Sequence, residues 1–180
     1  MPTATLSFVD RFARLQDYEA WSGGLVVNSV QTAERTLLSQ ASRIGIPAAD
    51  IYDKYARAVS TFGHIQWARR LWLSRISRCD PPPDVMPSKE WPISRLGEES
   101  RTLDGLWTKY LAGLKDSDLG RKVEYRTTEG KDQSGTLIDI LTHVFNHSAY
   151  HRGQIAMLVR QCGGDPAATD FIFFCRETGS

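Results

Sequence analysis

Apolar residues recur at helical spacing in four long stretches of this 180-residue chain, and no other feature limits the fold as strongly. The stretches cover about residues 6–42, 51–78, 94–114 and 137–162. Amphipathic helices of this length must bury one face against each other. The sequence therefore predicts an all-α four-helix bundle, formed by residues 1–180 as a single domain.

Helix-breaking segments separate the predicted helices. The sequence "GIPAAD" (45–50) interrupts the chain after the first helix. The proline-rich connector "CDPPPDVMPSKEWPIS" (79–94) follows the second, because consecutive prolines cannot continue a helix. The segment "RKVEYRTTEGKDQSG" (121–135) instead alternates apolar with charged residues around a Glu-Gly turn. This alternation predicts a short β-hairpin between the third and fourth helices.

The fourth helix has the clearest boundaries. Thr136 followed by Asp139 forms a capping-box pattern at its start, and Gly163-Gly164 followed by Pro166 is a strong stop signal. The apolar tail "TDFIFFCRE" (169–177) comes next and is expected to pack against the bundle.

Charge and cysteine content exclude several classes of protein. The formal net charge of +1 gives no basic surface for nucleic acid or an acidic membrane. The apolar runs are too short to span a bilayer, and the N-terminal residues lack the pattern of a secretion signal. The three scattered cysteines form no CxxC pair and predict neither disulfides nor a thiolate zinc site. A reducing cytoplasm is the expected location.

Three of the four histidines lie four residues apart on the fourth helix, at His143, His147 and His151. Residues at this spacing drift by only about 40° around a helix, so the three share an arc roughly 80° wide. The same arc holds apolar residues expected to face the core, and His64 on the second helix shares its side with Trp67. All four histidines are therefore expected to point inward.

Buried imidazoles need partners for their ring nitrogens, or desolvation costs a few kcal/mol, about 1–3 for each group. A divalent cation accepts several neutral nitrogens at once. A straight helix can bring only two adjacent histidines to one ion, which leaves His64 as the remaining histidine for a third ligand. Spacing alone leaves separately hydrogen-bonded histidines as an equal alternative.

Three segments carry a resemblance to a known family. The end of the chain, "HVFNHSAYHRGQIAMLVRQCGGDPAATDFIFF" (143–174), closely resembles the DinB/YfiT-like family, whose members are regarded as metal-dependent. "FGHIQWARRLWLSRI" (62–76) matches the second-helix motif of that family. "DYEAW" (17–21) is similar to its first-helix motif, although Glu19 stands where asparagine is more usual.

The resemblance implies a four-helix bundle that binds a divalent metal through His64, His147 and His151. Zinc, nickel and iron are all compatible with imidazole ligands. His143 would then lie beside the ligands or line a cavity. Asn146 or Gln154 could orient a ligating imidazole through its second ring nitrogen.

Other residues are expected to support this site. Tyr18, Trp21 and Trp67 are interpreted as core or cavity-lining residues. Arg152 is expected to pair with Asp170 and hold the tail against the bundle.

The resemblance favours a thiol-dependent, S-transferase-like enzyme of detoxification or stress response. Such an enzyme would use a low-molecular-weight thiol and a small-molecule substrate, and would form a homodimer. Metal-dependent hydrolysis is one alternative, with Asp17, Glu19 and Asp139 as candidate bases. A non-catalytic bundle with a structural metal is the other.

Overall fold

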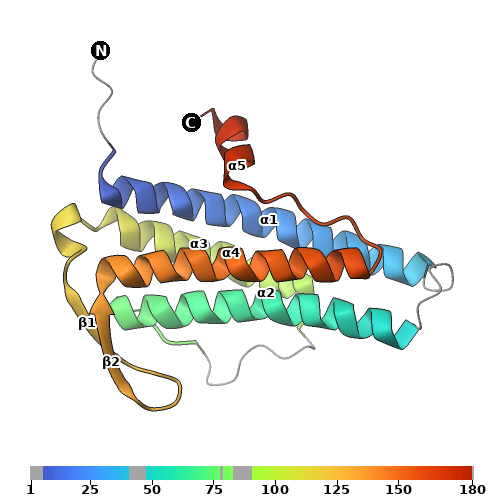
Figure 1. Cartoon of the computed structure of the whole chain (residues 1–180), viewed down its shortest axis with the longest axis horizontal. Coiled ribbons are helices and arrows are strands. Elements are labelled where there is room, and N and C mark those ends of the chain that lie inside the picture. The colour runs from blue at the N-terminus through green and yellow to red at the C-terminus, as the bar shows by residue number, and fades with distance from the viewer. Residues whose placement is uncertain (1–5, 41–47, 78, 83–90, 180) are drawn as a thin grey trace.

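The computed structural model describes residues 6–40, 48–77, 79–82 and 91–179. Four long helices pack side by side, the first and fourth running in one direction and the second and third in the other, and a two-stranded hairpin separates the third from the fourth (Figure 1). The long helices are α1 (Phe8–Gln40), α2 (Ala48–Ile76), α3 (Ile93–Ala112) and α4 (Leu137–Gln161). The remaining elements are the short 3-10 turn η1 (Asp116–Asp118), β1 (Lys122–Arg126), β2 (Asp132–Thr136) and the C-terminal α5 (Phe171–Thr178). The predicted all-α bundle with a hairpin is confirmed.

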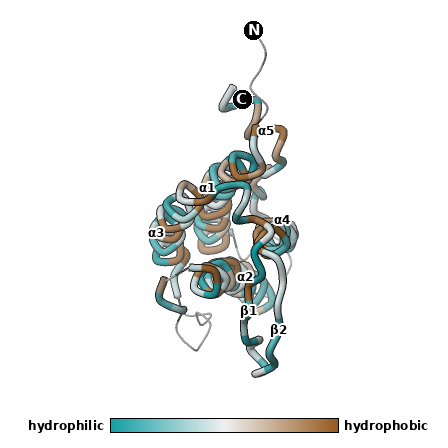
Figure 2. Tube along the Cα trace, turned by 90° about the vertical axis from the view of Figure 1, so that its left-hand side faces the viewer, coloured by the Kyte–Doolittle hydropathy of each residue, from teal (hydrophilic) through white to brown (hydrophobic). Residues whose placement is uncertain are grey.

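The helices pack as two closely associated pairs. α4 lies against α2 and α1 against α3, and the end-on view of Figure 2 shows apolar positions turned towards the space between them. None of the helices in the described ranges combines the length and apolar character that crossing a bilayer requires.

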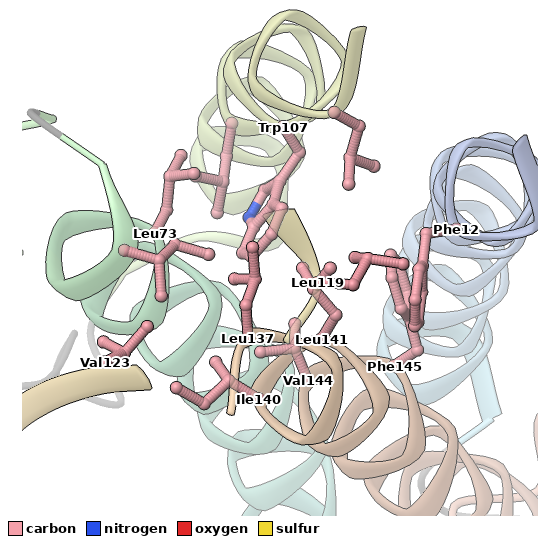
Figure 3. Packing of buried hydrophobic residues seen from close by; sticks show 13 residues of the cluster. Phe12, Leu73, Trp107, Leu119, Val123, Leu137, Ile140, Leu141, Val144 and Phe145 are labelled. Atoms are coloured by element: carbon pink, nitrogen blue, oxygen red, sulfur yellow. The ribbon is translucent and has the colours of Figure 1, made fainter. Parts of the chain in front are cut away.

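One of two large apolar clusters fills the end of the bundle where the hairpin attaches (Figure 3). Trp107 of α3 is fully buried at its centre, with Leu73 of α2 and Leu141 of α4 close by. Val123 of β1 adds its side chain to the same cluster. The hairpin is therefore joined to the core through the inward face of β1.

β2 leads directly into α4 through a capped helix start. The backbone N–H of Asp139 donates to Thr136 Oγ1 at 3.3 Å, and the Thr136 hydroxyl donates to the Asp139 carboxylate. Lys122 pairs with Thr136 at the end of the hairpin, and Gly130 takes a positive φ of 81° in its turn. The predicted helix start and turn are confirmed, so the first residue of α4 is fixed by both hairpin and cap.

A close approach of α1 follows the end of α4. The N–H of Gly164 donates to the carbonyl of Val159 at 3.0 Å. A Cβ on Gly164 would lie 2.8 Å from the Ala33 Cβ and 3.0 Å from the Val159 Cγ1. Only glycine fits between the two helices here.

The N-terminus of α1 is capped by a side chain that lies far away in the sequence. The carboxylate of Asp116 accepts hydrogen bonds from the backbone N–H groups of Phe8 and Val9 at 3.1 and 2.9 Å. Unpaired N–H groups at a helix start need such an acceptor. The turn after α3 thus caps α1.

Buried charged groups connect all four long helices. Arg69 of α2 lies 2.7 Å from the Asp104 carboxylate of α3 and donates to Gln16 of α1 at 3.1 Å. Arg152 of α4 lies 2.5 Å from the carboxylate of Glu19 of α1, which is also 4.0 Å from Arg69. We call the following five residues the ionic network: Gln16, Glu19, Arg69, Asp104 and Arg152. Burial alone would lower the pKa of Arg152, and the facing Glu19 carboxylate more than offsets this and raises it.

The expected pairing of Arg152 with Asp170 is wrong. Arg152 is only 3% exposed, and its carboxylate partner is Glu19 on the neighbouring helix. The sequence placed Arg152 on α4 but gave no information about which helix would lie opposite it. A buried guanidinium needs a carboxylate partner because burial removes its hydration, and Glu19 of α1 is that partner.

Gly164→Ala should lower the free energy of unfolding by about 1–3 kcal/mol, because the new methyl group overpacks the contact with Ala33. Gly105→Ala is the matched control, since Gly105 is exposed within α3 and a Cβ there meets nothing within 4 Å. The control should gain up to about 1 kcal/mol from helix propensity. Urea unfolding of both variants tests this, and equal stabilities would contradict the close approach.

Arg152→Met should lower the free energy of unfolding by about 3–5 kcal/mol, because it leaves the buried Glu19 carboxylate without its nearest counter-ion. The double variant Glu19→Met, Arg152→Met should be more stable than Arg152→Met alone, since Arg69 retains Asp104. Thermal and urea unfolding measure both. If the double variant is no more stable than the single one, the charge pairing is not what holds α4 to α1.

Candidate metal centre

Three histidines from two helices converge between α2 and α4. The Nε2 atom of His147 lies 3.1 Å from the Nε2 atom of His64 and 3.1 Å from that of His151. One ligand atom from each of the three lies within 4.8 Å of the others. Antiparallel packing of α2 on α4 brings the middle of one helix beside the middle of the other (Figure 1). The two separate sequence motifs therefore meet at one point.

The cluster lies at the edge of the helix pair. His64, His147 and His151 are half-buried, and His143 is exposed. The expectation that all four histidines point into the core is therefore only partly correct, because three are half-buried and His143 is not buried. Four-residue spacing rotates each successive histidine by about 40°, so the arc begins at the surface with His143 and turns towards the core at His147 and His151.

His143 stands beside the cluster without joining it. Its ring centroid lies 5.6 Å from that of His147 and 5.4 Å from that of Trp72, in an edge-on contact. The three-histidine group does not include its nitrogens. This position matches the geometric limit that one straight helix offers two ligands to one ion.

The environment favours neutral imidazoles. Burial, followed by the neighbouring His151, His64 and His143, lowers the pKa of His147 to about 4. Burial and then His151 also lower the pKa of His64. Neutral imidazole is the form that binds a metal ion.

Hydrogen bonds between the histidines cannot satisfy all the ring nitrogens. In a neutral ring, the Nε2 of His147 carries either one proton or one lone pair. It nevertheless lies 3.1 Å from two other Nε2 atoms, those of His64 and His151. One proton or one lone pair serves only one of these contacts, so the other contact is left without a complementary donor or acceptor. A cation that accepts a lone pair from each ring would remove the conflict. The donor set thus fits a divalent metal ion, and this cluster could bind one.

Gln154 orients one of these rings. Its Oε1 lies 2.8 Å from His151 Nδ1, and since an amide oxygen only accepts, Nδ1 carries the proton. That tautomer leaves the lone pair of His151 on Nε2, which faces the cluster. Asn146, the other residue considered for this role, is exposed and makes no side-chain hydrogen bond within the described part of the chain.

The three aromatic residues considered for the site lie at two other places. Tyr18 and Trp21 of α1 hold the tail: the Tyr18 hydroxyl donates to the Thr169 carbonyl, and Trp21 Nε1 donates to Glu177 at 2.7 Å. Both rings also contact Phe174 of α5 at 5.8 Å. The expectation that the tail packs against the bundle is confirmed.

Trp67 lines a separate cavity of about 250 Å³. Residues of α2, α3 and the connector form its walls, among them Gln66, Arg70, Pro82 and Trp91.

One group of residues beside the histidines was not predicted from the sequence. Trp72 and Arg75 of α2 and Tyr125 of β1 form a half-buried cluster that continues from His143. A signal was available, because Arg75 is eleven residues after His64 and so lies on the same face of α2. The contribution of Tyr125 depends on the hairpin folding back onto α2, which the local pattern does not reveal.

Comparison with known proteins places the chain in a family. The model of the DinB family matches residues 48–179, which span α2 to α5 and include all three clustered histidines. Protein DinB from Bacillus subtilis (strain 168) is 19% identical over 163 residues, which cover 88% of this chain and 90% of that protein. No solved structure matches the chain. Since the family match covers well over half of the sequence, the chain belongs to the DinB family.

Proposed function

We propose that this protein is a metal-dependent enzyme in which His64, His147 and His151 bind a divalent cation and a low-molecular-weight thiol is the co-substrate. The convergence of three imidazole Nε2 atoms at a half-buried point carries the proposal. The reaction class is S-transfer from the thiol to a small electrophile, in detoxification or stress response. Zinc, nickel and iron all suit this ligand set.

The ligand count supports a reactive site. Three protein ligands leave a coordination position open, whereas structural zinc sites use four. A bound divalent cation would supply Lewis acidity there and lower the pKa of a thiol in that position. Partial exposure of His64, His147 and His151 gives a small molecule access from solvent.

The residues of the chain have distinct roles in this proposal. His151 is oriented by Gln154, which keeps its Nε2 lone pair on the cluster. Desolvation keeps His147 neutral, so protons compete little with the cation near neutral pH. The neighbouring exposed ring of His143 would border the substrate.

Hydrolysis receives less support than thiol transfer because the candidate bases have other roles. Glu19 is buried in ion pairs with Arg152 and Arg69. Asp139 belongs to the N-terminal cap of α4. Asp17 is exposed on α1, outside the three-histidine group.

Turnover assays separate the candidate functions. The metal-loaded protein is incubated with an electrophile such as 1-chloro-2,4-dinitrobenzene, with and without a panel of thiols. S-transfer predicts product only when a thiol is present, and hydrolysis predicts ester cleavage without thiol. A metal that only joins two helices predicts neither reaction, together with a large loss of thermal stability when a chelator removes the ion.

His147→Ala should abolish stoichiometric binding of zinc or cobalt, because His147 is the ligand between the other two. Helical content should change little. His143→Ala is the matched control on the same helix, and it should keep full metal occupancy. Elemental analysis and circular dichroism of both variants test the assignment, which full occupancy in His147→Ala would overturn.

The metal-free protein should lose stability as the pH falls from about 6.5 towards 4. His147 has a pKa of about 4 when folded and the ordinary histidine value of 6.5 when unfolded, so the unfolded chain binds more protons across this window. The free energy of unfolding therefore rises with pH there. In His147→Gln the same curve should be flatter. Urea unfolding between pH 4.5 and 7.5 measures both, and parallel curves would show that His147 is not desolvated.

A further inference from the structure

Arg75 lies near the end of α2, held against the hairpin by two aromatic rings. Its Cζ is 4.7 Å from the ring centroid of Trp72 and 5.1 Å from that of Tyr125. Its Nη2 donates to the Arg126 carbonyl at 2.6 Å. These contacts fix the position of the guanidinium.

Arg75 differs from the buried arginines of the ionic network. Arg69 and Arg152 each face a carboxylate at 2.7 Å or less. Arg75 is half-buried, yet among the described residues it has no carboxylate within ion-pair distance and donates only through Nη2. Burial lowers the pKa of Arg75, because it removes part of the hydration of the guanidinium. An anion from outside the chain would compensate for this loss of hydration.

A continuous row of rings leads from Arg75 to the histidine cluster. Tyr125 contacts Trp72 at 4.9 Å between centroids, Trp72 contacts His143 at 5.4 Å, and His143 contacts His147 at 5.6 Å. Along α2, eleven residues separate His64 from Arg75, or about 16 Å at 1.5 Å per residue. The row consists of half-buried or exposed side chains throughout, so a ligand could lie along it.

We propose that Arg75, supported by Trp72 and Tyr125, binds the carboxylate of an elongated thiol whose sulfur lies at the histidine cluster. The inference rests on the proposed function and adds the substrate class: a molecule roughly 10–16 Å long with an acidic end remote from its reactive end. A planar guanidinium suits a carboxylate because it offers paired N–H groups. Trp72 and His143 offer ring surface to the body of the molecule between its two ends.

Two thiols of equal length test the carboxylate end. Cobalt-loaded protein is titrated with 8-mercaptooctanoate and with 8-mercapto-1-octanol, and the absorption band of the cobalt–sulfur bond gives each Kd. The wild type should bind the acid about tenfold more tightly than the alcohol, the effect expected of one charged hydrogen bond. Arg75→Gln should lose this preference, and Arg75→Lys should keep part of it because the charge remains.

Arg126→Gln is the matched control. Arg126 is an exposed arginine of β1, the strand that carries Tyr125, with its side chain turned to Gly130 and Asp132. It should keep the full preference for the acid. Equal affinities for acid and alcohol in the wild type, or an equal loss in the Arg75→Gln and Arg126→Gln variants, would overturn the inference while leaving the metal site intact.

A second measurement needs no metal. Metal-free protein is titrated with octanoate, and the indole N–H signal of Trp72 is followed by NMR, with Arg75→Gln for comparison. The signal should shift in the wild type and move several-fold less in the variant. If this signal does not move, the anion site is disproved even when cobalt binds. If it moves but no cobalt–sulfur band forms with either thiol, the proposed function fails and the anion site stands.

Discussion

The charge pairing of Glu19 with Arg152 and Arg69 sets the arrangement on which the rest of the protein depends. Both arginines and Glu19 are almost completely buried, so each loses its hydration and must keep its partner. A slide of α4 by one turn, about 5.4 Å, would separate these charges. The same register places His147 and His151 opposite His64. The ionic network therefore acts on the histidine site through the helices, because it fixes their axial positions.

Much of the fold could be predicted from sequence because its signals are local. The helical period, the cap at Thr136 and the glycine stop after α4 are all properties of neighbouring residues, and the structure has them where expected. The meeting of His64 with His147 and His151 followed from a geometric limit together with the family resemblance. The homodimer, the cytoplasmic location and the thiol stay predictions.

What the sequence did not reveal concerns partners between helices. Periodicity tells which face of α4 is apolar, but it does not tell that α1 lies opposite Arg152, so Asp170 was the wrong partner. The half-buried position of the histidines depends on where the edge of the α2–α4 contact falls. The contact of Tyr125 with Trp72 depends on a hairpin folding onto a helix that precedes it by almost fifty residues. These are tertiary facts with no local signature.

The capping of α1 by Asp116 has a consequence for how the chain reaches its native state. α1 is synthesised before both of its distant partners, because its leading N–H groups are satisfied by the turn after α3 and its buried Glu19 by α4. Early in synthesis it therefore lacks both its acceptor and its counter-ion. Contacts so distant in sequence make the closing step slow. Assembly of the bundle waits until most of the polypeptide has been synthesised.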